Sequence, residues 1–240
     1  MTRAAIIAAL PGELKPLVRG WAHERRGSVD LWRWKFDEGE WIAACAGAGQ
    51  SAATRAFAEI EKDGPMTLAI SVGWAGALRE EFECGKTYRA GKVIDVKTGE
   101  TFQVAHWWEE LLVATSPKVA DSTEKKRLAS TYGAALVDME GAAVARLAAM
   151  RGIPFYCIKA VSDGLNDRLP DFNRFIASDG SFQLTRLALY AAFRPQYWPA
   201  LIRMGENSRR ASKSLAEAVL DFLDERGTIR ERNGHPNFQR

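Results

Sequence analysis

The chain has 240 residues, of which 47% are hydrophobic, and a formal net charge of +3 at neutral pH. This length suits one sizeable domain with a buried core, and so small a charge gives no reason to expect nucleic-acid binding. No apolar run approaches the ~20 residues of a membrane span. The three cysteines, Cys45, Cys84 and Cys157, show no metal-ligand spacing, so we expect no metal site. We expect them to be free thiols in a reducing compartment, which predicts a cytoplasmic protein.

Predicted strands and helices alternate along the chain, which is typical of an α/β domain. Apolar and β-branched runs predict strands at residues 4–10, 29–36, 41–45, 66–72, 88–96, 111–115, 134–137 and 153–161. Helical periodicity predicts helices at residues 52–62, 139–151, 182–193 and 203–223, and one from the turn at residues 11–13 to about residue 20. The first strand is a continuous apolar run, and we interpret it as a core strand rather than a signal peptide.

We expect the chain to divide at residue 193, with the α/β domain at residues 1–193 and a C-terminal helical extension at residues 194–240. Pro195 and Pro199 interrupt the helical pattern between the two parts. The last helix carries an apolar stripe formed by Ala211, Leu215, Val219 and Phe222. Beyond Arg226 the sequence is polar, which predicts a disordered end.

Residues 46–52, AGAGQSA, match the G-x-G-x-x-A pattern of dinucleotide sites. Such a site also needs an acidic residue at the end of the following strand, where this chain has Ser71-Val72-Gly73. We therefore expect no nicotinamide cofactor, and no other cofactor is indicated.

Glu13, Glu140 and Asp163 each follow a predicted strand. Ligands of open α/β sheets bind at the carboxyl ends of strands, so these acids are candidate site residues. Each acid alone also suits a helix N-terminus, where a carboxylate stabilises the helix dipole. Glu140 is harder to explain in that way, because Met139 and residues 141–143 give it an apolar setting in which an unpaired carboxylate is costly.

The segments around Glu140 and Asp163 carry a family resemblance. Residues 137–143 read VDMEGAA, and IKAVSDGLND follows at residues 158–167. The pair resembles the V-E-M-E-x-x-A and R-A-I-S-D segments of the nucleoside phosphorylase/nucleosidase superfamily, which includes purine nucleoside phosphorylases and methylthioadenosine/S-adenosylhomocysteine nucleosidases. The resemblance covers about residues 4–190. It implies a single α/β domain with a central twisted mixed β-sheet flanked by helices.

The resemblance also implies roles for individual residues in cleaving a purine N-glycosidic bond. Asp163 matches the aspartate that protonates the leaving purine at N7, with Ser162 as its orienting neighbour. Glu140 matches the glutamate that accepts hydrogen bonds from the ribose hydroxyls, and Met139 packs on the sugar. Glu13 matches the glutamate that activates water in the hydrolase branch. An acid and a base with divided roles is the general logic of glycoside hydrolysis.

Residues 73–78, GWAGAL, resemble the family's G-S-A-G-G-L turn, and Ala75 and Gly76 would let the backbone approach the nucleoside. Trp74 and Ser71 stand where hexameric bacterial phosphorylases carry a serine and an arginine that hold phosphate. The usual phosphate clamp is therefore missing, which favours a hydrolase. Lys159 replaces an arginine of the nucleosidases, and this keeps the charge but loses the bidentate geometry.

Two other functions stay open at this point. A phosphorylase could use a different anion site, built on the turn at residues 47–49, which in the family lines the ribose and nucleophile region. A nucleoside-binding protein without catalysis would accommodate Trp74 and Lys159, although the three acids argue against it. The expected partner in every case is a small-molecule purine nucleoside, with phosphate in the phosphorylase case. We also expect a homo-oligomer, a dimer or a trimer.

The C-terminal part allows two interpretations. Residues 190–202, YAAFRPQYWPALI, join aromatic and apolar side chains to two prolines, and basic residues follow. One interpretation is an extra helix that packs on the core or on a second subunit. The other is a basic, aromatic lip for peripheral contact with a membrane, suited to a nucleoside with a long apolar 5′ substituent. The chain loosely resembles phosphorylase-family proteins of hopanoid synthesis, whose substrate is an adenosyl lipid. Residues 106–108, HWW, are a further candidate for ligand or core packing.

Overall fold

The computed structural model describes residues 2–37, 39–105, 110–167 and 170–225. Its strands are β1 (Thr2–Ala8), β2 (Ala22–Arg26), β3 (Val29–Phe36), β4 (Gly39–Cys45), β5 (Leu68–Ala77), β6 (Thr87–Arg89), β7 (Lys92–Asp95), β8 (Thr101–Gln103), β9 (Leu112–Thr115), β10 (Leu136–Asp138) and β11 (Phe155–Asp163). The α-helices are α1 (Pro11–Leu14), α2 (Gln50–Glu61), α3 (Ser122–Tyr132), α4 (Gly141–Met150), α5 (Leu184–Ala192) and α6 (Trp198–Glu225). Short 3₁₀ turns cover Phe172–Phe175 and Pro195–Tyr197.

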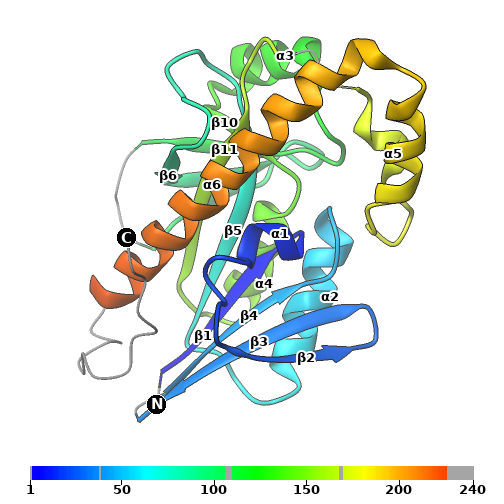
Figure 1. Ribbon diagram of the computed structural model, residues 1–240. Coiled ribbons are helices and arrows are strands. Elements are labelled where there is room, and N and C mark those ends of the chain that lie inside the picture. The colour runs from blue at the N-terminus through cyan, green and yellow to red at the C-terminus, as the bar shows by residue number, and fades with distance from the viewer. Residues whose placement is uncertain (1, 38, 106–109, 168–169, 226–240) are drawn as a thin grey trace.

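The strands form one mixed sheet organised around β5. Along its main path the order is β2-β3-β4-β1-β5-β10-β9-β7-β8, while β11 pairs with β5 and β6. β1 and β11 run parallel to β5, and β10 runs antiparallel to it. The helices α2 and α4 cover one face of the sheet, and α6 crosses the other face diagonally (Figure 1). This confirms the predicted α/β fold with a mixed sheet flanked by helices.

The centre of the sheet is buried on both faces, as expected for strands with continuous apolar runs. The apolar residues 4–8 of β1 are all fully buried, and so are Ala69 and Ile70 of β5. On the other side, the predicted stripe of α6 lies against the sheet, where the ring of Phe222 packs at a tilt of 51° against that of Tyr156, with ring centroids 4.8 Å apart. The stripe is confirmed, because its members are at most 2% exposed: Ala211, Leu215, Val219 and Phe222.

The most consequential difference from the sequence prediction concerns residues 73–78. The predicted turn after Val72 is wrong, because β5 continues to Ala77. Gly73 bends the strand with a φ of 139°, and β11 pairs with it on through Gly76. The continued pairing satisfies the backbone polar groups that a turn would have left to solvent.

Other elements differ in extent. The first helix ends at Leu14 rather than near residue 20, and the predicted strand at residues 88–96 is two strands, since β6 pairs with β11 and β7 pairs with β9. Three elements, β2, β8 and α3, were not predicted from the sequence. The helix α6 begins five residues before its predicted start, because Pro199 is tolerated in a helix's first turn.

Two predictions fall outside the described residues: the packing of residues 106–108 and the disordered end beyond Arg226. In the part of the chain that the structure describes, no helix is both long enough and apolar enough to cross a membrane.

Candidate active site

The site residues named from the sequence converge on one cavity of about 1440 Å³. Eight of them line it: Glu13, Trp74, Ala75, Gly76, Met139, Glu140, Ser162 and Asp163. They meet because β1, β10 and β11 all pair with β5. The strands that carry Glu140 and Asp163 are not paired with each other, because β10 lies between β5 and β9 while β11 lies between β5 and β6.

The carboxylate of Glu13 is held at the cavity wall by three backbone N–H groups. Its Oε2 accepts hydrogen bonds from Ala9 N at 2.9 Å and Leu10 N at 2.7 Å, and its Oε1 accepts one from Trp74 N at 2.7 Å. A carboxylate offers about four acceptor positions, so about one remains on Glu13. A Cβ on Gly73 would lie 2.7 Å from Glu13 Oε1, which explains why this bend of β5 carries a glycine.

Glu140 lies opposite, directly after β10. Its Oε1 accepts a hydrogen bond of 2.6 Å from Gly49 N, and its Oε2 accepts a longer one of 3.3 Å from Met139 N. By the same count, about two acceptor positions stay open toward the cavity. Gly49 can present its N–H in this way because it adopts a φ of 94°, which side-chain-bearing residues rarely do.

Between the two glutamates lies an ion pair that sequence analysis did not identify. Lys159 and Asp138 have side chains 1% and 0% exposed, and Lys159 Nζ lies 2.7 Å from Asp138 Oδ2. Lys159 Nζ also donates to Ser71 Oγ at 2.9 Å. Asp138 accepts further hydrogen bonds from Thr115 Oγ1 at 2.7 Å and from Gly141 N at 2.8 Å. Both charges are therefore satisfied without solvent, as buried ions must be.

The cluster holds three carboxylates, Glu13, Asp138 and Glu140, around one ammonium. Burial raises the pKa of Glu13, although its three backbone hydrogen bonds and Lys159 oppose the shift. Burial also raises the pKa of Glu140, and the charge of Asp138 raises it further. Burial alone would lower the pKa of Lys159, but the negative charges around it, above all Asp138, raise the pKa beyond its ordinary value. Burial thus makes both carboxylates more basic than an exposed glutamate.

Asp163 is the last residue of β11, reached through an irregularity in the pairing at Ser162. Such bulges re-aim side chains, and here both residues face the cavity. Ser162 Oγ donates to Asp163 Oδ1 at 2.6 Å, while the other oxygen, Oδ2, contacts the ammonium of Lys125 from α3. Lys125 also lines the cavity, but nothing in the polar run STEKKRLASTY distinguished it as a site residue.

Trp74 connects the site to the C-terminal helix. Its indole Nε1 donates to Ser212 Oγ at 3.0 Å, and Ser212 Oγ donates in turn to Gly12 O at 3.0 Å. Through these two hydrogen bonds, Trp74 of β5 is connected to α6 and to α1. Its large side chain fills the space that a serine at this position would leave open.

The N–H groups of residues 47–49, in the glycine turn, all donate to acceptors inside the protein. Gly47 N donates to Ala9 O at 3.0 Å, Ala48 N donates to Gly180 O at 2.8 Å, and Gly49 N donates to Glu140. A Cβ on Gly47 would lie 2.4 Å from Gly180 O. The glycines thus allow two backbone segments to cross closely, and the turn has no N–H among these three left for an anion.

An apolar part of the cavity wall comes from the C-terminal helices and the segment before them. It includes Phe172, Ile176, Leu184, Leu187, Leu201 and Met204. Within residues 2–37, 39–105, 110–167 and 170–225, no group of three or more histidine, cysteine or acidic residues is arranged to hold a metal ion.

The sequence matches a known family over part of its length. Residues 109–189 match the sequence model of the phosphorylase superfamily. Over 46 residues, 19% of the chain, it is 44% identical to 5′-methylthioadenosine/S-adenosylhomocysteine nucleosidase of Treponema pallidum (strain Nichols). The matched segment spans 17% of that protein's length.

The fold is similar to solved structures over nearly the whole chain. A Helicobacter pylori nucleosidase mutant with 5′-methylthioadenosine in its active site has a TM-score of 0.72 at 15% identity, covering 94% of this chain and 99% of that one. Native futalosine hydrolase of the same species gives 0.72 at 15% identity, covering 93% and 98%. The apo 5′-methylthioadenosine nucleosidase of Arabidopsis thaliana gives 0.71 at 17% identity, covering 97% and 98%. The chain is thus similar to the phosphorylase superfamily in sequence over residues 109–189, and it is similar to these nucleosidases in fold over nearly its whole length.

Proposed function

We propose that this protein is an N-ribosyl hydrolase that cleaves the N-glycosidic bond of a purine nucleoside carrying a 5′ substituent. The observation that carries the proposal is Glu13, a buried carboxylate fixed by three N–H groups with about one acceptor position left. That position suits one water molecule. The names of the relatives, nucleosidase and futalosine hydrolase, support the same class of reaction.

In this mechanism Glu13 is the general base. It takes a proton from the water as the water oxygen bonds to C1′ of the ribose, and the raised pKa of Glu13 makes it a better base than an exposed glutamate. The bond from C1′ to N9 breaks, and its electron pair moves into the purine. Asp163, oriented by Ser162, delivers a proton to N7 of the leaving base.

Glu140 and Met139 form the ribose side of the site. The two acceptor positions left on Glu140 suit the 2′- and 3′-hydroxyls, and its charge opposes the positive charge that develops on the sugar. Met139 lies next to Glu140 on the cavity wall and packs on the sugar in this arrangement. Ala75 and Gly76 give the base a wall with little side chain.

Phosphorolysis is the less favoured alternative. The turn at residues 47–49 uses its three N–H groups internally. Ser71, which stands where hexameric bacterial phosphorylases carry the phosphate-binding arginine, accepts a hydrogen bond from Lys159 Nζ through its hydroxyl. A non-catalytic nucleoside-binding role is also less favoured, since Glu13, Glu140 and Asp163 face one cavity.

The C-terminal helices support a finer proposal about the substrate and its surroundings. Ligand cavities commonly measure about 300–1,000 Å³, and the larger volume here comes with the apolar wall of α5 and α6. We propose that this wall receives an apolar 5′ substituent, with an adenosyl lipid as the extreme case. The same corner exposes five large apolar side chains at 50–82% exposure: Leu184, Leu189, Phe193, Trp198 and Ile202.

Membrane contact and homo-oligomerisation are the two uses of that exposed corner to be separated. Phe193→Glu and Ile202→Glu change residues that are 82% and 62% exposed, so neither alters the core. Loss of co-sedimentation with anionic lipid vesicles, at unchanged molecular mass in solution, supports membrane contact. A smaller particle in light scattering supports an oligomer interface. No change in either measurement rejects both uses.

Purine release from a panel of adenosine, inosine, methylthioadenosine, adenosylhomocysteine and futalosine tests the main proposal, with and without phosphate. We expect release that does not depend on phosphate, and the second product should be ribose from adenosine or inosine and the 5′-substituted ribose from the other nucleosides. Asp163→Asn should reduce kcat by about 10²–10⁴, because the amide keeps the shape and cannot deliver the proton. Ribose 1-phosphate formed only with phosphate would favour the phosphorylase, and binding without any release would favour the non-catalytic role.

A further inference from the structure

Lys125 is a buried lysine that reaches the proposed acid from a helix outside the family signature. It lies on α3, its side chain is 3% exposed, and its Nζ contacts Asp163 Oδ2 and donates to Gly164 O at 2.6 Å. An ammonium has three donors, and these contacts use two of them. Lys125 also lines the cavity, so the amine lies where the base of a nucleoside would meet Asp163.

The backbone around this contact is shaped to admit it. A Cβ on Gly76 would lie 3.0 Å from Lys125 Cε and 3.1 Å from Asp163 Oδ2. A glycine at this point of β5 therefore leaves room for both side chains to meet over the strand. Removing a lysine from water is costly unless its charge is paired, so such close packing indicates a contact with a purpose beyond covering the sheet.

The contact poses a chemical problem for the proposed reaction. An acid must carry a proton to donate it, whereas a carboxylate in contact with an ammonium forms an ion pair and has none to give. Ser162 Oγ donates to Asp163 Oδ1, so the serine does not supply that proton while it holds this hydrogen bond. In hydrogen-bond contact with Asp163, the group that carries a transferable proton is the ammonium of Lys125.

We propose that Lys125 is a further catalytic residue, the source of the proton that Asp163 passes to the leaving purine. This inference rests on the proposed nucleoside cleavage. As the bond from C1′ to N9 breaks, Lys125 Nζ gives a proton to Asp163 Oδ2, and Asp163 gives a proton to N7. Lys125 is then a neutral amine, and Glu13 holds the proton taken from water. Return of that proton to Lys125 through solvent restores the starting state.

Three other groups belong to the surroundings of the pair: Cys84, Asp167 and Arg210. Burial raises the pKa of the Cys84 thiol, and the charges of Asp167 and Asp163 raise it further, so this thiol stays neutral. Asp167 Oδ2 accepts a hydrogen bond of 2.7 Å from Gly164 N. This contact holds the loop whose Gly164 carbonyl oxygen accepts the other hydrogen bond from Lys125.

The pH profile of Lys125→Met tests the relay. Without the amine, Asp163 must take its proton from solvent, and this becomes more frequent as the pH falls. We expect kcat to fall by about 10²-fold or more at about pH 8 and by less than about tenfold at about pH 5. A uniform loss across this range would overturn the relay.

Lys125→Arg is the matched control, because a guanidinium keeps the positive charge and the hydrogen bond but holds its proton. The relay predicts a loss of kcat in this variant comparable to that of Lys125→Met at about pH 8, with KM little changed. Retention of wild-type kcat would show that Lys125 only positions Asp163, and the relay would be wrong.

Two measurements keep the test interpretable. Thermal melting reports whether each variant folds. The double variant Lys125→Met/Asp163→Asn removes both charges, so it should fold even if Lys125→Met fails to fold because Asp163 is left without its cation. In that double variant the relay predicts no recovery of activity at about pH 5, because the amide cannot carry the proton; recovery would contradict it. If the wild-type protein releases no purine, the proposed function fails, whereas wild-type release with an unchanged profile in both lysine variants defeats the relay alone.

Discussion

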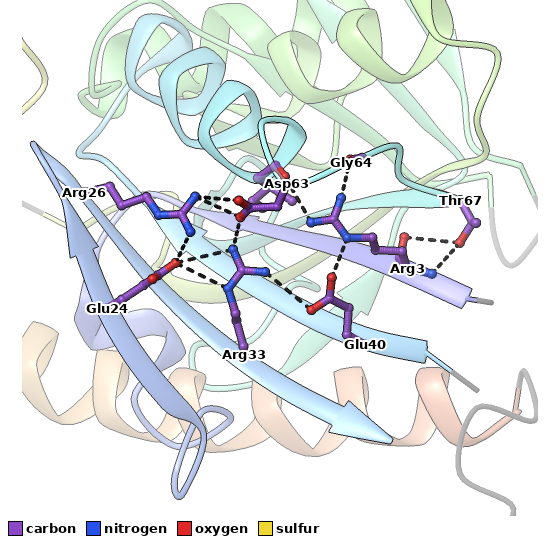
Figure 2. A network of polar contacts seen from close by, with 9 residues as sticks. Arg3, Glu24, Arg26, Arg33, Glu40, Asp63, Gly64 and Thr67 are labelled. Carbon is purple, nitrogen blue, oxygen red and sulfur yellow. Dashed lines mark hydrogen bonds and ion pairs between the residues drawn. The ribbon is translucent and has the colours of Figure 1, made fainter. Parts of the chain in front are cut away.

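Two clusters of charged side chains lie at opposite ends of the central strands. The amino-end network joins the starts of β1 and β4 to β2, β3 and the segment before β5, and consists of Arg3, Glu24, Arg26, Arg33, Glu40 and Asp63 (Figure 2). The carboxyl-end cluster consists of Glu13, Asp138, Glu140 and Lys159. The first balances three cations against three anions, while the second sets one cation against three carboxylates.

The two clusters also differ in the solvent exposure of their side chains. Side chains of the amino-end network are 11–41% exposed, so solvent and salt screen their ion pairs. Lys159 and Asp138 are at most 1% exposed. Charged groups that stabilise a fold are usually balanced in sign and exposed to solvent, whereas a buried cluster with excess negative charge raises the pKa of its own carboxylates. Ion pairing alone therefore does not identify a functional site, whereas buried and unbalanced charge that faces a cavity does.

Breaking the buried pair is the largest expected effect. Lys159→Met leaves Asp138 buried without its cation, and we expect a loss of about 3–5 kcal/mol in the free energy of unfolding, measured by urea denaturation. Catalysis should fall as well, because Lys159 lowers the pKa of Glu13 and of Glu140 and so favours the charged carboxylates that the proposed reaction uses.

The control for this variant is Asp138→Asn/Lys159→Met. It removes both charges, so it should be more stable than Lys159→Met alone, in spite of carrying one more substitution. If the double variant is the less stable of the two, the pair does not act as a buried ion pair.

Glu140→Gln is expected to act on catalysis more than on the fold. The amide oxygen still accepts from Gly49 N, but the charge that opposes the ribosyl cation is lost. A hydrogen bond to a charged group contributes about 1.5–3 kcal/mol, so kcat/KM on a ribonucleoside should fall by about 10- to 150-fold. Unchanged kinetics would mean that Glu140 is only a helix-terminus acid.

The same variant makes the raised pKa visible in stability. Because burial raises the pKa of Glu140 above its ordinary value of 4.5, the folded protein binds this proton more tightly than the unfolded chain does. The stability of the wild-type protein relative to Glu140→Gln should therefore fall as the pH rises from about 5 to about 8, by at most about 1.4 kcal/mol per pH unit. Parallel stability curves over that range would contradict the raised pKa.

The carboxyl-end site was more predictable than its charge network. Signature residues named Glu13, Glu140 and Asp163, and all three face one cavity. Asp138 stands in the quoted VDMEGAA segment, yet its role depends on pairing with Lys159 across the sheet, which no local pattern encodes. Lys125 could not be found at all, because a lysine in a polar helix looks solvated until the helix is packed.

Fold prediction succeeded where apolar runs are long and failed where pairing decides. The buried strands β1 and β11 and the alternating strand β3 were found nearly to their ends. The polar strand β2 and the short strand β8, in contrast, depend on pairing with β3 and β7. The continuation of β5 beyond Val72 was not predicted, because a glycine in such a segment normally indicates a turn. Here Gly73 instead allows the strand to approach Glu13 closely.

The smallest effect is expected at the amino end. Arg33→Gln removes a side chain that pairs with Glu24, Glu40 and Asp63, and all of these are partly exposed. Exposed pairs contribute about 0–1 kcal/mol each, and Arg26 still pairs with Asp63 at 2.8 Å in its absence, so the loss should be about 1 kcal/mol. Salt sharpens the contrast: between about 0.05 M and about 0.5 M NaCl this loss should shrink, while that of Lys159→Met should stay nearly constant. A larger loss from Arg33→Gln than from Lys159→Met would reverse the comparison and assign the main electrostatic stabilisation to the exposed network.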